Sequence, residues 1–226
     1  MRNALVAIAT ALVILGGSIV PFTTPAYVRF EQDRAGVAIP DYTPADLDAV
    51  DASLLGDVVL WRGDFDVTVL GFPVLSEADR AHMRDVRGVF TGLWILVLAA
   101  VAVLAWGFWR SRANDGARAS VWHAIGRGAR GLAIGVVVLG VLAFVAFDAM
   151  FELFHRLFFS GNYTFDPATD HLVQLFPAQF WFETTMFLGV VLVIVSIAVA
   201  WIASRRSRAA MRRIPVPAAP AAAAAE

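Results

Sequence analysis

The stretch Ser76–Trp109, SEADRAHMRDVRGVFTGLWILVLAAVAVLAWGFW, decides the fold, because it joins a helix start to a membrane-length apolar run. Its first four residues match a capping box in which Asp79 stands in place of the usual Glu. The uncharged run Val89–Trp109 has the length that a bilayer-crossing helix needs, about 20 residues. No strong helix breaker separates the two parts, so we predict one helix that begins outside the membrane and enters it. His82 then lies about one or two turns above the hydrocarbon boundary.

Three further uncharged apolar runs of membrane length occur, at Ala4–Phe22, Gly131–Phe147 and Thr184–Ala203. The chain of 226 residues is 59% hydrophobic and 16% charged, whereas soluble domains are about 45–50% apolar and about 25% charged. Backbone inside a bilayer must satisfy its own hydrogen bonds, so each run is predicted to be a helix. A cleavable signal peptide is an alternative for the first run, but a single Arg2 and a long apolar core favour a retained helix.

Arginine placement predicts the orientation of this four-helix bundle. Five Arg lie in the connection 110–130 and five more in the tail, and by the positive-inside rule both segments and both termini are cytoplasmic. The outer segments 23–88 and 151–183 then carry a net charge of −9, and the cytoplasmic segments carry +9. Asp148, near the end of the third run, supplies the remaining charge of the total of −1. The residues next to the Arg clusters give no indication of nucleic-acid binding. The absence of cysteine excludes disulfides and thiolate metal sites.

We therefore expect a mainly α, polytopic membrane protein with a small extracytoplasmic α+β cap subdomain. Within the cap, Thr43-Pro44 indicates a helix start, and residues 61–72 with Gly71 indicate a hairpin. The low-complexity end of the chain is predicted to be disordered. The expected parts are transmembrane helices at 1–22, 86–109, 131–152 and 184–203, the cap subdomain at 23–85, a cytoplasmic loop at 110–130, an interfacial segment at 153–183 and a cytoplasmic tail at 204–226.

Ionisable side chains gather at the outer end of the third run. Asp148, Glu152 and His155 are spaced i, i+4 and i+7, so they share one face if the helix continues. Charged groups at that depth are costly and mark function by default. Two histidines from different helices, His82 and His155, are thus predicted to meet at one membrane boundary. The plainer alternatives are a surface His82 and structural ion pairs between these carboxylates and Arg84 or Arg87; His123 and His171 are weaker candidates.

The motifs around these histidines resemble a known family. They are Leu75–Arg87 (LSEADRAHMRDVR), Phe151–His155 (FELFH), Phe165–Pro167 (FDP), Leu175–Phe180 (LFPAQF) and the Tyr27-x-Arg29-Phe30 segment after the first span. In order and spacing, roughly over residues 1–205, the chain is similar to the four-pass bacterial membrane family that includes the lipoprotein intramolecular transacylases.

The resemblance implies an activity and a site. Active members move an acyl chain from the diacylglyceryl group of a lipoprotein's N-terminal cysteine to its α-amine, in the bacterial cytoplasmic membrane. The family's catalytic histidines correspond to His82 and His155, and no cofactor or metal is implied. The implied partners are the diacylglyceryl lipoprotein N-terminus and membrane lipids. As supporting residues we expect Asp148 or Glu152 to orient His155, Arg84, Arg87 or Arg29 to serve the oxyanion or headgroup, and Asp85 and Tyr27 to lie nearby.

Two other functions use the same residues. In the first, His82, His155 and nearby carboxylates hold a metal ion or relay protons, since histidine and carboxylate are zinc ligands. In the second, the protein is a non-catalytic scaffold whose cap binds a partner. Imidazoles more than about 10 Å apart would argue against an acid–base pair, because proton transfer needs hydrogen-bond reach or one bridging water.

Overall fold

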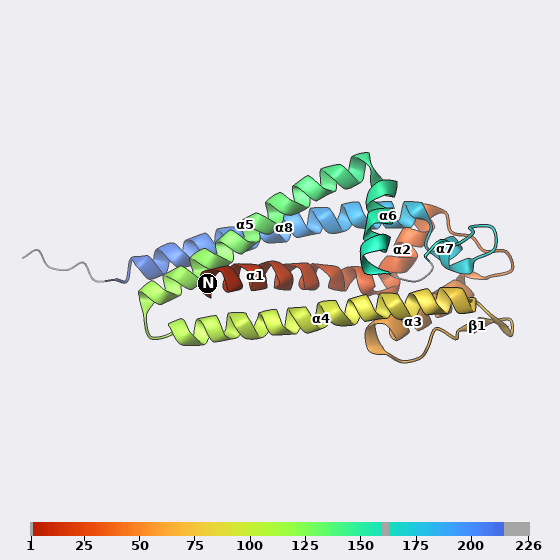
Figure 1. Ribbon diagram of the computed structural model, residues 1–226, viewed down its shortest axis with the longest axis horizontal. Coiled ribbons are helices and arrows are strands. Elements are labelled where there is room, and N and C mark those ends of the chain that lie inside the picture. Colours follow the sequence, from red (N-terminus) through yellow and green to blue (C-terminus); the bar gives the residue numbers. More distant parts are fainter. Residues whose placement is uncertain (1, 160–162, 215–226) are drawn as a thin grey trace, which may run out of the picture.

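Four long helices form the body of the protein, and each is long and apolar enough to cross a membrane. The computed structural model describes residues 2–159 and 163–214; the predicted disorder after Pro215 lies outside this part of the chain. The protein is therefore a multi-pass membrane protein built on a four-helix bundle (Figure 1). The four helices are α1 (Arg2–Ile19), α4 (Glu77–Ser111), α5 (Asp115–Val145) and α8 (Ala178–Met211).

The shorter elements gather at one end of the bundle and form the cap, while the start of α1 and the end of α8 lie toward the other end (Figure 1). The cap contains mostly helix and one two-stranded antiparallel hairpin, as expected for a small α+β subdomain. Its elements are η1 (Val20–Thr23), α2 (Pro25–Ala35), α3 (Pro44–Leu60), β1 (Thr68–Val69), β2 (Phe72–Pro73) and α7 (His171–Leu175).

The α4 helix confirms the prediction of one continuous element. Its start is a complete capping box, in which the Ser76 hydroxyl accepts from the Asp79 amide at 3.2 Å and the Asp79 carboxylate accepts from the Ser76 amide at 3.0 Å. The 35 residues of α4 extend about 52 Å at about 1.5 Å per residue, well beyond a hydrocarbon core of about 30 Å. The helix therefore crosses the bundle and also forms a wall of the cap, which carries His82 into the cap.

An apolar core holds the cap together. Val50, Leu54, Phe65 and Leu175 are all at most 2% exposed and come from α3, the following loop and α7. The α3 helix begins after Thr43 as predicted, and Thr43 forms a capping box with Asp46 there. In the hairpin, Leu70 and Gly71 both have positive φ, as a type I′ turn requires.

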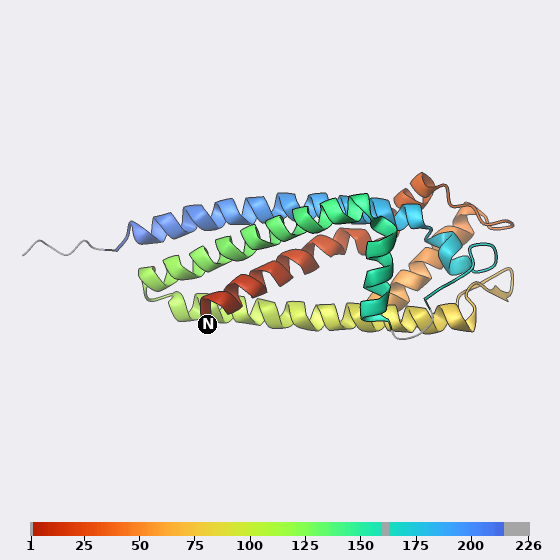
Figure 2. The same cartoon turned by 45° about the horizontal axis from the view of Figure 1, so that its top comes forward.

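The third membrane helix differs from its predicted course. It starts at Asp115, so much of the expected 110–130 loop is helical, and it ends at Val145 instead of continuing to 152. Ala146 leaves the helical conformation, and α6 (Phe147–Phe158) then runs across the bundle toward α4 (Figure 2). The physical reason is composition: α6 has one strongly apolar face and one charged face, which suits a helix lying in the membrane interface.

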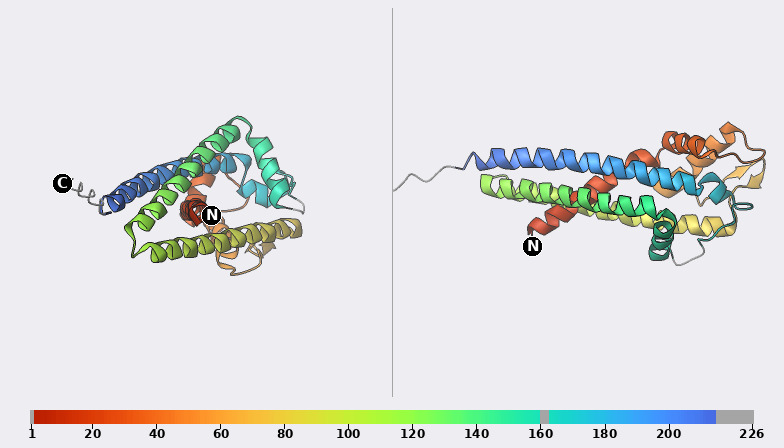
Figure 3. Two further views of the ribbon diagram at one scale, coloured as in Figure 1. Left: turned by 60° about the vertical axis from the view of Figure 1, so that its left-hand side comes forward. Right: turned by 90° about the horizontal axis from the view of Figure 1, so that it is seen from above.

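The bundle is centred on α1. This helix lies between α4 on one side and α5 and α8 on the other, as the left-hand view of Figure 3 shows. Val6 and Ile14 of α1 pack against α5 and α8 together with small side chains, of which Ala124, Ala129 and Ala203 are fully buried. Small residues let helix backbones approach closely, which is how helices associate in lipid.

A buried polar pair crosses the cap. The Gln32 amide donates to Asp51 at 2.9 Å and to the Leu175 carbonyl at 3.3 Å, and it so joins α2, α3 and the end of α7. Asp51 is only 1% exposed. Burial raises the pKa of the Asp51 carboxyl to about 6, although the Gln32 hydrogen bond opposes the shift.

This pKa shift predicts how stability depends on pH. The folded pKa lies above the ordinary value of 3.8, so Asp51 stabilises the fold most at low pH, and that contribution is lost as the pH rises through about 6. Relative to Asp51→Asn, the native protein should lose about 1–3 kcal/mol of stability between pH 4 and pH 7. Thermal midpoints of both proteins in detergent micelles measure this difference. A difference that stays constant over this range would contradict the assignment.

Candidate active site

His82 on α4 and His155 on α6 meet at the junction of the cap and the bundle. Their ring centroids are 5.8 Å apart with an angle of 14° between the rings. Both side chains are buried, at 8% and 9% exposure. The separation is well inside the 10 Å limit for a cooperating pair, and one small reacting group can lie within reach of both rings.

Aromatic side chains enclose the pair. Phe159 contacts both histidines, with centroids 4.8 Å from His82 and 5.2 Å from His155. Phe165 lies 5.4 Å from His82, and Tyr163 lies 5.3 Å from His155. These aromatics were not predicted as site residues, although the density of Phe and Tyr after His155 was a signal. The immediate surroundings of the two imidazoles are consequently apolar.

Hydrogen bonding fixes the tautomer of neutral His155. Its Nδ1 lies 2.8 Å from the carbonyl oxygen of Phe151. A carbonyl only accepts, so Nδ1 carries the hydrogen and the lone pair of the neutral ring resides on Nε2. His155 therefore presents Nε2 as a proton acceptor.

His82 differs from its partner. Its Nδ1 is buried and has no hydrogen-bond partner within residues 2–159 and 163–214. Burial lowers the pKa of His82, repulsion from His155 lowers it further, and attraction by Asp85 acts in the opposite sense. His82 is thus held neutral near pH 7, with one ring N–H available to donate a hydrogen bond.

The expected carboxylates lie on the outside of α6. Asp148 and Glu152 are exposed, and Glu152 pairs with Arg156 one turn later at 2.5 Å. His155 is the residue of α6 whose side chain is buried. Asp148, Glu152 and His155 all lie in α6, so their spacing keeps them on one face as predicted. The two carboxylates are exposed on that face, whereas the His155 ring is buried. Asp85 is also exposed and acts on His82 through its charge.

The arginines named from the sequence are engaged in the cap. Arg84 forms ion pairs with Asp64 at 2.8 Å and Glu77 at 2.9 Å. Arg87 donates to the Gly63 carbonyl at 2.9 Å, and its guanidinium lies 4.4 Å from the centre of the Trp61 ring. Through these contacts both arginines hold the loop that follows α3 against α4.

The remaining predicted residues lie on α2. Arg29 faces Asp33 and Asp48 at 3.3 and 3.7 Å. The Tyr27 hydroxyl donates to Thr184 on α8 at 2.8 Å, and burial raises the pKa of Tyr27 to about 12. No contact with His82 or His155 is found for either residue in the part of the chain that the structure describes.

Three comparisons place this architecture among known proteins. The sequence model of the lipoprotein intramolecular transacylase (Lit) family matches residues 54–181, more than half of the chain. An uncharacterized protein of Aquifex aeolicus (strain VF5) is 25% identical over 126 residues, which are 53% of this chain and 52% of that protein. The chain therefore spans about half the length of this relative.

Solved structures give the same fold. The in meso structure of Lit from Bacillus cereus superposes with a TM-score of 0.71 at 18% identity, covering 94% of this chain and 95% of that one. A variant of the same protein with one histidine replaced by alanine gives a TM-score of 0.72, with 93% and 94% covered. At this identity the likeness shows the four-helix fold with its cap. Because the sequence model matches more than half of its length, the chain belongs to the lipoprotein intramolecular transacylase family.

Proposed function

We propose that this protein is a lipoprotein intramolecular transacylase that moves an acyl chain from the diacylglyceryl group of an N-terminal cysteine to the α-amine of that cysteine. The observation that carries the proposal is the buried pair His82 and His155, whose ring centroids are 5.8 Å apart among aromatic side chains at the junction of membrane helices and cap. A lipid-modified protein has its acyl chains in the bilayer and its amine at the headgroup level, which is the arrangement that this junction suits.

The proposed step conserves every atom of one substrate molecule. The α-amine has an ordinary pKa of about 8, so a neutral amine is available near pH 7 at little cost. Its nitrogen attacks the ester carbonyl, and Nε2 of His155 takes the amine proton. The C–O bond to glycerol then breaks, and the same proton passes to the glycerol oxygen. His82 donates its N–H to the oxyanion of the tetrahedral intermediate, where a fixed donor in apolar surroundings acts strongly.

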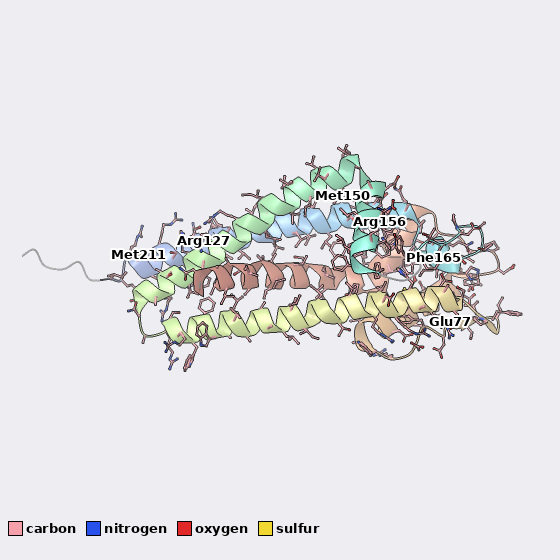
Figure 4. The ribbon with its side chains drawn as sticks, in the orientation of Figure 1. Glu77, Arg127, Met150, Arg156, Phe165 and Met211 are labelled. Carbon is pink, nitrogen blue, oxygen red and sulfur yellow. The ribbon has the colours of Figure 1, made fainter. Side chains whose placement is uncertain are left out.

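The proposed location is the bacterial cytoplasmic membrane, with both termini cytoplasmic and the histidines at the outer leaflet. The charge distribution supports this orientation. Arg127 and Met211 lie toward one end of the bundle, and Phe165 and Glu77 lie at the cap end (Figure 4). The Arg-rich segments thus lie away from the cap, as the positive-inside rule requires for an outward-facing cap.

Mass spectrometry of a diacyl lipoprotein co-expressed with this protein tests the function. We expect an acyl chain on the N-terminal amine and one free hydroxyl on the glycerol, with no change in the total mass of the lipoprotein. Fragment ions locate the chain. The matched control is a strain that carries His155→Ala. An unchanged lipoprotein in both strains would refute the proposal and leave the scaffold function.

The metal-binding alternative finds less support in the geometry. Within residues 2–159 and 163–214, no group of three or more His, Asp or Glu side chains is arranged to hold a metal ion. Asp148 and Glu152, the carboxylates predicted beside His155, are exposed, and Glu152 pairs with Arg156. The transacylase uses the two histidines as the structure places them, whereas a metal site requires ligands that the described residues do not bring together.

A further inference from the structure

A cavity lies at the start of α4, at the cap end of the bundle. It has a volume of about 450 Å³ and lies between residues 73–80 and residues 169–171. Pockets that bind small ligands have volumes of about 300–1,000 Å³, so this one accommodates one or two amino-acid side chains. The residues that matter here are Ser76, Glu77, Asp79, Arg80, Asp170 and His171.

Asp79 contributes an unpaired hydrogen-bond acceptor to this cavity. The residue is 1% exposed. Its Oδ2 accepts from the Ser76 amide at 3.0 Å and from the Ser76 hydroxyl at 2.9 Å. Its Oδ1 is buried and has no partner among the residues that the structure describes. Buried polar atoms in proteins are nearly always paired, so this acceptor calls for a donor from water or a ligand.

The walls of the cavity are acidic. Asp79, Glu77 and Asp170 supply three carboxylates, and Arg80 is the one arginine in the lining. That arginine forms an ion pair with Glu77, so the other two carboxylates are not neutralised by it. A ligand with N–H groups or a positive charge fits this lining, and a carboxylate does not.

The cavity adjoins the histidine site along α4. His82 follows Asp79 by three residues, a rise of about 4.5 Å along the helix. Phe165, which packs against His82, begins the segment that leads to Asp170. In Figure 4, Glu77 lies beyond Phe165 at the cap end. The cavity therefore lies next to the histidines, on the side away from the membrane helices.

We infer that this cavity binds the stretch of lipoprotein polypeptide that follows the lipidated cysteine, and that it selects basic over acidic residues there. The inference rests on the proposed function, which fixes the amine at the histidines and the acyl chains in the bilayer. The polypeptide then has to leave toward the aqueous side. An extended chain spans about 3.3–3.6 Å per residue, so the first one to three residues after the cysteine reach the cavity.

Binding of two synthetic lipopeptides to the full-length protein in nanodiscs of zwitterionic lipid tests the inference. Both carry diacylglyceryl-cysteine with an acetylated amine, which cannot react, and they differ by two Lys or two Glu after the cysteine. We expect the Lys peptide to bind about five- to tenfold more tightly, since each exposed or half-exposed charge pair contributes up to about 1 kcal/mol. The preference should shrink in Asp170→Asn and reverse in Asp170→Lys.

Asp170→Asn retains an oxygen for the hydrogen bond that Asp170 accepts from the Asp166 amide, so the loop keeps its shape. Asp66→Asn is the matched control, because Asp66 is an exposed cap carboxylate that does not line the cavity. Equal affinity for the two peptides, no measurable binding of either, or the same ratio in the Asp170 variants would overturn the inference. Acyl transfer to a free-amine lipopeptide is measured in parallel. Its failure overturns the proposed function, while the ratio of the two affinities reports on the cavity separately.

Discussion

The substitution His155→Ala is expected to lower the rate of acyl transfer by about a hundredfold or more, the usual contribution of a positioned general base. The backbone carbonyl of Phe151 accepts the Nδ1 hydrogen bond of His155 and leaves Nε2 free to act as the base in the proposed step. An alanine has no group that can carry the amine proton to the glycerol oxygen. The rate is measured as N-acylated product formed from a diacyl lipopeptide in proteoliposomes, with mass spectrometry as the readout.

His82→Ala is expected to cause a loss of similar size, but glutamine at the two positions should separate their roles. A glutamine side chain donates N–H bonds and does not accept and release protons near pH 7. His82→Gln should therefore keep part of the activity, whereas His155→Gln should be as slow as His155→Ala. His123→Ala, an exposed histidine on α5, is the control and should react at the native rate. Equal rates for the two glutamine variants would contradict the division of roles.

The parts of the fold that depend on local sequence were predictable. The α4 helix was read correctly from its start at Ser76 and from an apolar run without a breaker, because capping and hydrophobic length are local properties. The helix start at Thr43 was predictable for the same reason. The closeness of His82 and His155 was also expected, because counting residues along the two helices places both side chains at the same membrane boundary.

The parts that depend on tertiary packing were not predictable. The two-faced composition of α6 favours a helix in the membrane interface, but no residue in Phe144–Phe147 marks where α5 has to end, since that run contains neither Gly nor Pro. The break lets α6 lie across the bundle with its apolar side toward the membrane and His155 toward α4. Nothing in the sequence distinguishes Asp51 from the other acidic residues of the cap. Its burial depends on Gln32 and Leu175, which are distant in the sequence.

Gly128 has no side chain and thereby lets α5 approach α1 closely. Of the substitutions proposed here, its replacement is expected to lower the stability of the protein most. A Cβ atom built on Gly128 of α5 would lie 2.2 Å from the carbonyl oxygen of Ala7 and 2.8 Å from its carbonyl carbon. These are backbone atoms of α1, so no side-chain rotation relieves the overlap, and the two helices would have to separate. Overpacking usually costs about 1–3 kcal/mol.

For Gly128→Leu we expect a loss at or above the upper end of that range, because helices in lipid associate through close packing and have no hydrophobic effect between them to compensate. Gly131→Leu on the same helix is the matched control: a Cβ at Gly131 meets nothing within 4 Å, and Leu favours helix more than Gly does. Thermal midpoints and monodispersity in detergent should fall for the first variant and hold for the second. Since α1 leads through η1 into α2, separating α1 from α5 also moves Tyr27 away from Thr184 and loosens the cap that carries His82. Equal midpoints for the two variants would show that the close approach at Gly128 does not set the stability of the bundle.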